Sequence, residues 1–206
     1  MFTGIIKFLG QINFLKQEED EDLTISILID NYLPNLYKSL KIGCSIACSG
    51  VCLTLIRKNI PCSEKIELIF QASDETKNKT TIKNWLVEDL VNVELSLKIG
   101  DEIGGHMVSG HIDEISQIKD IIKNKDSHIF IFSLPENVKK FISKKGSIVL
   151  NGVSLTINDV GNQKFSVNII KQSFENTNFH LLKINDYVNL EIDTIARYLN
   201  KIVNDG

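Results

Sequence analysis

The sequence lacks a strong excess of charge of either sign. Its 206 residues include 23 lysines and arginines against 26 aspartates and glutamates, for a formal net charge of −3. Surfaces that bind nucleic acid normally carry a marked basic excess. Nucleic acid is therefore not an expected partner, and a small or neutral ligand fits this balance better.

Long apolar runs are also missing. No stretch approaches the ~20 residues that a membrane-spanning helix needs. The apolar first ten residues are interrupted by Gly4, Lys7 and Gly10, and no small-residue cleavage site follows them. We therefore expect a mature N-terminus, no membrane association and a cytoplasmic location.

Cysteine is scarce, with only Cys44, Cys48, Cys52 and Cys62. The first three recur every fourth residue, which would place thiolates on one helical face, but Gly43 and Gly50 break any helix there and no fourth ligand lies nearby. We expect no metal site and four reduced thiols packed as small apolar groups. The phosphate-binding glycine patterns G-x-G-x-x-G and Walker A are absent as well.

One ten-residue stretch is present twice. The segment Ser45–Thr54, SIACSGVCLT, returns 102 positions later as Ser147–Thr156, SIVLNGVSLT, with six identical residues. Further matches occur at spacings of 106 (MFTGII with MVSGHI) and 97 (VNVE with VNLE). A falling spacing is typical of duplicated domains whose loops have shortened in one copy. The repeat predicts two related pockets with unequal chemistry.

Both copies consist of short stretches with β-strand patterns. The alternation from Leu23 to Ile29 predicts one strand, and Ile46–Arg57 predicts another, followed by a turn at Lys58–Pro61 and a partner strand at Lys65–Gln71. Many short strands and few helical patterns predict a small closed barrel or sandwich for each copy.

The C-terminal tail has a helical pattern instead. Its apolar residues recur at steps of three and four, and Asp193 or Thr194 is placed to cap the start of a helix; the apolar residues are Ile192, Ile195, Ala196, Leu199, Ile202 and Val203. Packing of this stripe against the same helix of other subunits is one interpretation, and docking onto its own barrel is the other.

Polar residues on two strands are the first candidates for chemistry. Cys52 and Ser154 each lie between a valine and a leucine, so they project from the opposite face of the strand. Threonines follow two residues later, at 54 and 156. A lone cysteine or serine in such a strand usually only packs, but the repeat gives both copies the same polar pair.

A glycine-rich joint carries two histidines, His106 and His111. Their spacing on a flexible stretch is a weak metal signal. Hydrogen bonding or proton transfer suits them better, and a structural role fits them almost as well.

The opening MFTGII, the joint DEIGGH followed by SGH, and the paired GVCLT and GVSLT together resemble the trimeric alpha-chain type of riboflavin synthase over essentially the whole chain. The resemblance implies an all-β fold of two homologous six-stranded Greek-key barrels plus a C-terminal α-helix. It further implies lumazine-binding barrels at 1–97 and 98–194 and an oligomerisation helix at 195–206.

The resemblance also implies an activity. Two molecules of 6,7-dimethyl-8-ribityllumazine exchange a four-carbon unit, giving riboflavin and 5-amino-6-(ribitylamino)uracil without metal or cofactor. The site would lie between the N-terminal barrel of one subunit and the C-terminal barrel of its neighbour in a homotrimer assembled by the tail helix. The alternative is a non-catalytic carrier that binds lumazine or flavin on the same fold. A carrier needs only one good pocket, so retention of both polar pairs favours the enzyme.

The motifs shared with this family also imply which residues of this chain form the site. The N-terminal pocket would comprise Gly4, Ile5, Ile6, Ser45, Cys52, Leu53, Thr54, Gln71, Ala72, Ser73, Asp74, Glu75 and Thr76. The C-terminal pocket would comprise Gly110, His111, Ile112, Lys145, Ser154, Leu155, Thr156, Ile170, Lys171, Gln172, Ser173, Phe174 and Glu175. Positions that the family associates with turnover are Phe2, Ser45, Cys52, His111 and Asp193. The sequence departs from the family at Gln172, where the resemblance implies a titratable side chain, so hydrogen bonding survives there but charge does not.

Overall fold

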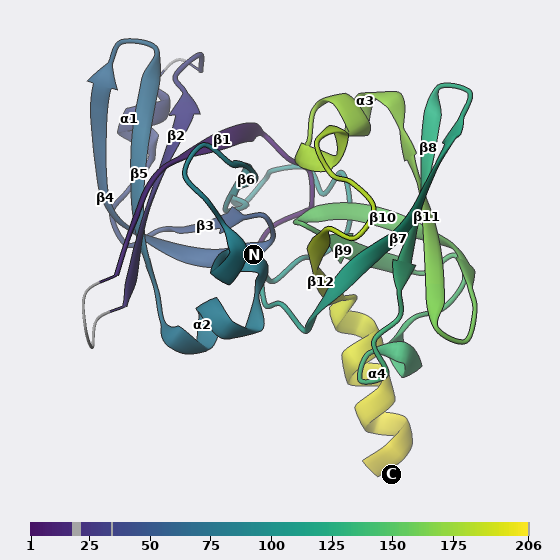
Figure 1. Ribbon diagram of the computed structural model, residues 1–206. Helices are drawn as coiled ribbons and strands as arrows, with labels where there is room; N and C mark the ends of the chain where they lie inside the picture. The colour runs from purple at the N-terminus through teal and green to yellow at the C-terminus, as the bar shows by residue number, and fades with distance from the viewer. Residues whose placement is uncertain (18–21, 34, 206) are drawn as a thin grey trace.

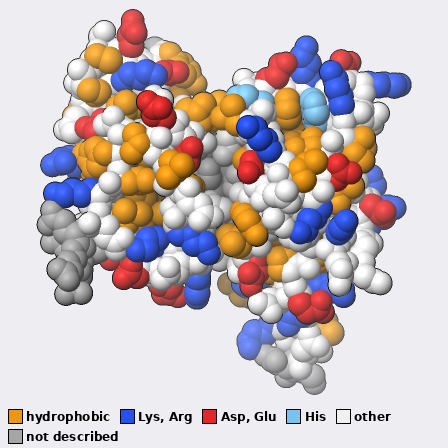
Figure 2. Space-filling view, viewed as in Figure 1, with side chains coloured by type: hydrophobic (Ala, Val, Ile, Leu, Met, Phe, Trp, Pro, Cys, Tyr) orange, Lys and Arg blue, Asp and Glu red, His pale blue; other side chains and the backbone are white. Residues whose placement is uncertain are grey.

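The computed structural model describes residues 1–17, 22–33 and 35–205. Two β-barrels lie side by side, and the C-terminal helix extends from the second of them (Figure 1). In the space-filling view the barrels form two lobes with a hollow between them, and the tail helix projects below the C-terminal lobe (Figure 2).

The N-terminal barrel contains six strands: β1 (Phe8–Lys16), β2 (Leu23–Asp30), β3 (Ser45–Cys48), β4 (Val51–Cys62), β5 (Lys65–Ala72) and β6 (Leu90–Leu95). They close in the order β1-β2-β5-β4-β3-β6.

The C-terminal barrel repeats this arrangement with β7 (Glu114–Asn124), β8 (Ser127–Ser133), β9 (Ser147–Leu150), β10 (Val153–Val160), β11 (Lys164–Ile170) and β12 (Tyr187–Ile192). Its closed order, β7-β8-β11-β10-β9-β12, is the same Greek key. The predicted pair of six-stranded barrels with a C-terminal helix is confirmed, and closure leaves neither sheet with a free edge.

Two details of the strand prediction were wrong. The stretch Ile46–Arg57 is a hairpin, because Ser49 and Gly50 adopt φ angles of 43° and 84° and reverse the chain between β3 and β4. The expected turn at Lys58–Pro61 lies within β4, whose pairing with β5 continues to Cys62 opposite Lys65. A register shift between Asn59 and Cys62 accommodates the proline, which cannot donate a ladder hydrogen bond.

Short helices connect the strands. They are α1 (Leu36–Ser39), α2 (Asp74–Lys79) and α3 (Lys171–Glu175), with 3₁₀ turns at Thr81–Asn84, Lys139–Phe141 and Asn178–His180. The cysteines are free thiols. Cys48 is buried, which raises the pKa of its thiol, whereas Cys62 is exposed and not packed as expected.

The barrels are joined by buried side-chain amides related by approximate two-fold symmetry. The amide nitrogen of Asn92 donates to the side-chain oxygen of Asn178 at 2.9 Å, and the backbone N–H of Asn178 donates back to Asn92 at 2.7 Å. The equivalent Asn189 accepts from the N–H of Thr81 at 2.8 Å and donates to the carbonyl of Ser49 at 2.8 Å. Since Asn92 and Asn189 are fully buried, these bonds fix how the barrels meet.

The tail helix α4 (Thr194–Asp205) begins as predicted, with the carboxylate of Asp193 accepting from the N–H of Ile195 at 2.9 Å. Its apolar side chains are exposed: Ile195, Tyr198, Leu199, Ile202 and Val203. The helix therefore does not bury this stripe against its own barrel. Among the described residues, no helix is long and apolar enough to cross a membrane.

Candidate functional site

The segment that opens each repeat contacts the opposite barrel. The carbonyl of Gly4 accepts from the N–H of Ser154, and the carbonyl of Gly110 accepts from the N–H of Cys52, both at 2.9 Å. Ile6 packs against the C-terminal core and Ile112 against the N-terminal core. We call residues 3–6 and 109–112 the crossing segments.

This exchange corrects the grouping expected from the sequence. Gly4, Ile5 and Ile6 were assigned to the pocket of Cys52, and Gly110, His111 and Ile112 to the pocket of Ser154. The structure reverses the two sets. Tandem order placed each segment with its own repeat, but hydrogen bonds to the other barrel decide its position.

Both crossings require glycine. Gly4 and Gly110 have φ angles of 76° and 80°, which side chains rarely adopt. An added β-carbon at Gly4 would lie 2.6 Å from the β-carbon of Ser154, and one at Gly110 would lie 2.7 Å from that of Cys52. The absence of a side chain therefore allows each backbone to lie directly against the polar residue of the other barrel.

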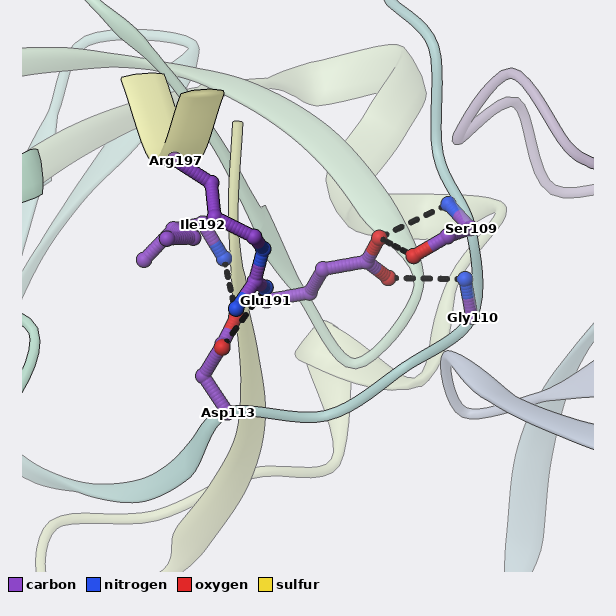
Figure 3. Close-up of polar contacts among 6 residues, drawn as sticks. All are labelled: Ser109, Gly110, Asp113, Glu191, Ile192 and Arg197. Atoms are coloured by element: carbon purple, nitrogen blue, oxygen red, sulfur yellow. Dashed lines mark hydrogen bonds and ion pairs between the residues drawn. The ribbon is translucent and has the colours of Figure 1, made fainter. Parts of the chain in front are cut away.

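A buried glutamate holds each crossing segment. Glu191 accepts from the N–H and hydroxyl of Ser109, at 2.7 and 2.6 Å, and from the N–H of Gly110 at 2.9 Å (Figure 3). Glu94 binds Thr3 and Gly4 in the same way, at 2.7, 2.8 and 2.9 Å. Burial raises the pKa of both carboxyl groups, and the donated hydrogen bonds partly oppose this.

These glutamates were absent from the predicted site. The signal was present in the sequence, because they end the repeated VNVE and VNLE motifs. Without the fold, a glutamate inside a strand pattern gave no indication of which backbone groups it would bind.

One crossing segment forms a wall of the larger cavity. This cavity, the C-terminal pocket, has a volume of about 690 Å³. Its lining combines the first crossing segment and neighbouring N-terminal residues with β10 and α3: Gly4, Ile5, Ile6, Lys7, Phe8, Leu9, Asp30, Tyr32, Val153, Ser154, Gln172, Ser173, Glu175, Asn176 and Thr177.

The other crossing segment borders a second cavity of about 330 Å³, the N-terminal pocket. It is lined by Met1, Ser45, Cys52, Met107, Val108, Ser109, His111 and Thr194. Ser45, Cys52 and His111, three of the five residues expected to act in turnover, therefore share one cavity. Thr194 also brings the first residue of the tail helix to this pocket.

The other two residues expected to act in turnover lie elsewhere. Phe2 is fully buried between the barrels, where it packs with Val108 and against Cys52. An added β-carbon at Gly110 would come within 3.0 Å of its ring. Phe2 therefore packs against Gly110 of the second crossing segment from within the interface of the two barrels. Asp193 caps α4 instead.

Several predicted binding residues line neither pocket. Leu53 and Leu155 face their barrel cores, and Thr54 and Thr156 are exposed on the outer faces. Lys145 is exposed in a left-handed turn with a φ of 69°. The remaining ones lie in the second crossing segment, from the end of β5 into α2, or on α3 and the residue before it: Gly110, Ile112, Gln71, Ala72, Ser73, Asp74, Glu75, Thr76, Ile170, Lys171 and Phe174.

His106 is a polar contact of the C-terminal pocket that the predicted set omitted. Its Nδ1 lies 2.7 Å from the hydroxyl of Ser154, which lines that pocket. Its Nε2 is buried and has no partner among the described residues. Burial lowers the pKa of His106, and the nearby Asp193 partly opposes this shift. Burial therefore favours the neutral form of the ring that contacts Ser154.

The second crossing segment is also tied to the tail helix. Asp113 accepts from the backbone N–H of Ile192 at 2.9 Å and from the guanidinium of Arg197 at 2.7 Å (Figure 3). The Asp113 side chain is only 14% exposed, so this ion pair is better shielded than an ordinary surface pair. The start of α4 is thus fixed relative to the segment that carries His111.

His106 leads to a prediction about pH. As the pH falls below about 6.5, the unfolded chain binds a proton before folded His106 does. Stability that depends on the neutral ring is therefore present above that pH and is lost as the pH falls towards the lowered pKa. In urea unfolding between about pH 7 and pH 5, we expect the wild type to lose more free energy of unfolding than His106→Gln. Equal pH slopes for the wild type and His106→Gln would contradict the prediction.

Comparisons with known proteins agree with this architecture. A family model described as the lumazine binding domain matches residues 3–96 and 109–193. The riboflavin synthase of Brucella abortus (strain 2308) is 38% identical over 203 residues, which cover 98% of each chain. That of Chlamydia muridarum (strain MoPn / Nigg) is 35% identical over 197 residues, covering 96% of this chain and 92% of the relative.

Solved structures share the fold. A crystal structure of LumP complexed with riboflavin matches with a TM-score of 0.80 and 24% identity, covering 94% of this chain and all of that chain. LumP complexed with 6,7-dimethyl-8-(1′-D-ribityl) lumazine gives a TM-score of 0.77. The two lumazine binding repeats and the nearly full-length identity to curated relatives show that the chain belongs to the riboflavin synthase family, a family of transferases.

Proposed function

We propose that the chain converts two molecules of 6,7-dimethyl-8-ribityllumazine into riboflavin and 5-amino-6-(ribitylamino)uracil by transfer of a four-carbon unit. The observation that carries the proposal is that Ser45, Cys52 and His111 meet in one pocket, while a second, related pocket has Ser154 in the place of Cys52. A reaction between two copies of one substrate needs two sites of similar shape and different chemistry.

The N-terminal pocket has groups suited to both steps. The C7 methyl group of the lumazine is acidic, so the first step removes a proton, and exposed His111 is a suitable proton carrier. The second step adds a nucleophile to the partner ring, or needs hydrogen bonds to it, which the half-buried Cys52 and Ser45 could supply. Holding the two rings in register would replace a bimolecular encounter with a unimolecular step.

The proposal includes a homotrimer in which the N-terminal pocket of one subunit meets the C-terminal pocket of its neighbour. The exposed apolar stripe of α4 supports assembly through this helix, because a partner would remove it from water. Thr194 lines the N-terminal pocket, so the helix borders the site that assembly would complete. A cytoplasmic location remains a prediction from the sequence.

The decisive experiment mixes the purified protein with the lumazine and follows riboflavin absorbance, without added metal or cofactor. We expect riboflavin and the uracil product in equal amounts, and sedimentation of the same sample should give the mass of three chains. Cys52→Ser and His111→Gln are each expected to lower kcat. Full turnover by both variants would refute the assigned roles but not the reaction.

The rival is a carrier that binds lumazine or flavin without turnover. It is favoured by one observation, that the matched LumP structures are complexes with lumazine and riboflavin. Binding of the lumazine with no new chromophore would establish this alternative and reject the enzyme.

A further inference from the structure

An aromatic cluster lies behind the short helix α3. The ring of His128, on β8, stacks on Phe174 with ring centroids 3.9 Å apart and planes 15° apart. His180 meets the same phenyl ring edge-on at 6.4 Å, and Phe130 lies 6.3 Å away. Figure 1 shows α3 near β8 at the top of the C-terminal barrel.

The residues on either side of Phe174 belong to the C-terminal pocket. Gln172, Ser173 and Glu175 line the cavity, whereas Phe174 packs against the barrel core and is not part of the lining. One phenyl ring therefore anchors to the barrel core the short helix that carries three pocket side chains.

Besides Phe174, helix α3 is held at its C-terminal end by hydrogen bonds from the side chains of Asn176 and Thr177 to the carbonyls of Gln172 and Ser173, at 2.8 and 2.6 Å. It has five residues, none of them buried, and Ile170 at its N-cap position provides no side-chain cap. Its ion pair, Lys171 with Glu175, spans 4.0 Å between exposed side chains. So short a helix is unstable by itself in water and depends on tertiary contacts.

The matching helix of the N-terminal barrel is held differently. Thr80 and Thr177 occupy equivalent places, since each hydroxyl donates to the carbonyl four residues earlier, at 2.7 and 2.6 Å. At this spacing Phe174 corresponds to Lys77, which contacts Asp74 at 3.0 Å and Gln17 at 2.7 Å. Ser73 also caps α2. The aromatic stack therefore distinguishes α3 from its counterpart α2.

His128 contributes to this cluster through the face of its ring, which stacks on Phe174. Its Nδ1 is buried without a hydrogen-bond partner in the described residues. An unpaired buried nitrogen costs free energy, so this nitrogen does not account for the placement of the ring. Stacking on Phe174 accounts for it, and a phenyl ring at position 128 would preserve the stack without the unpaired nitrogen.

We propose that the stack of His128 on Phe174 positions α3 and thereby sets the affinity of the C-terminal pocket for its ligand, with His128 as a positioning residue outside the cavity. The proposal rests on the proposed function, because it takes the lumazine as the ligand of this pocket.

The test is calorimetric titration of the full-length protein with 6,7-dimethyl-8-ribityllumazine. The wild type should bind two molecules per chain. His128→Ala should weaken one site about ten-fold, which corresponds to about 1.4 kcal/mol and is the size of an aromatic stack. The other site should keep its affinity, and His128→Phe should restore the weakened site. In the turnover assay, His128→Ala should raise KM more than it lowers kcat.

Two further variants assign the effect to a pocket. Gln172→Trp, at an exposed position of the lining, should fill the C-terminal pocket, and in that background His128→Ala should have no effect on the remaining site. Lys77 of α2 is the counterpart of Phe174, and Lys77→Ala should leave the affinity of the His128-dependent site unchanged.

Unchanged affinity in His128→Ala, equal weakening of both sites, or a His128→Phe variant as weak as His128→Ala would each overturn the proposal while leaving the proposed function intact. A wild-type protein that binds no lumazine would overturn both.

Discussion

Replacing Glu191 by alanine is expected to lower the free energy of unfolding by about 2–4 kcal/mol and to reduce turnover at least about ten-fold. The loss of stability follows because up to three donors lose a charged acceptor, and each such hydrogen bond is worth about 1–3 kcal/mol. The N–H of Gly110 is buried and cannot recover its bond from water. The same substitution frees the segment that places His111 in the same pocket as Cys52. Urea unfolding and the riboflavin assay measure the two effects.

Two further variants test whether the buried carboxylate of Glu191 causes both effects. Glu136→Ala removes an exposed carboxylate with 83% of its side chain accessible, and should leave stability and turnover unchanged. Glu191→Gln should destabilise less than alanine, because burial disfavours the charge. It should still lower turnover, since the amide NH₂ would face a backbone N–H. If Glu191→Ala unfolded like the wild type, the glutamate would not be holding the crossing segment.

The second large effect is expected at Gly110. In Gly110→Ala, the new methyl group would lie 2.7 Å from the β-carbon of Cys52 and 3.1 Å from its backbone nitrogen. A positive φ costs an alanine about 1–2 kcal/mol, and overpacking adds about 1–3 kcal/mol. Turnover should fall about 100-fold, the size of effect that a 1 Å misplacement of reacting groups produces.

Gly100→Ala is the matched control. Gly100 has a φ of 96° and nothing within 4 Å of an added β-carbon, so this variant carries the backbone strain without the steric clash. Its free energy of unfolding should fall only by the cost of the positive φ, and its turnover should be unchanged. Equal losses in the two variants would show that the close approach to Cys52 is unimportant.

The repeat made much of the fold predictable. The matched SIACSGVCLT and SIVLNGVSLT stretches, together with strand alternation, indicated two similar β-domains, and each stretch forms a hairpin at the same place in its barrel. The turn at Lys58–Pro61 was misplaced because proline normally ends a strand. Here an irregularity in the pairing of β4 with β5, which the amino-acid pattern does not reveal, keeps the strand intact.

The site was only partly predictable from the sequence. Ser45, Cys52 and His111 were selected as candidates, and the structure places them in one cavity, although His111 had been assigned to the other pocket. Glu94 and Glu191 were missed, and His106 was considered but left out of the predicted site, because their importance depends on partners distant in the sequence, such as Ser154 for His106.

The amino-acid sequence alone showed the duplication, the difference between Cys52 and Ser154, and the amphipathic tail, since all three are local patterns of side chains; the choice of barrels over sandwiches came from the family resemblance. The tertiary structure was needed to show which barrel each crossing segment contacts. That choice rests on backbone hydrogen bonds from Ser154 to Gly4 and from Cys52 to Gly110. Every residue except proline carries the same backbone donor and acceptor, so the amino-acid sequence does not indicate which carbonyl a given N–H will bind.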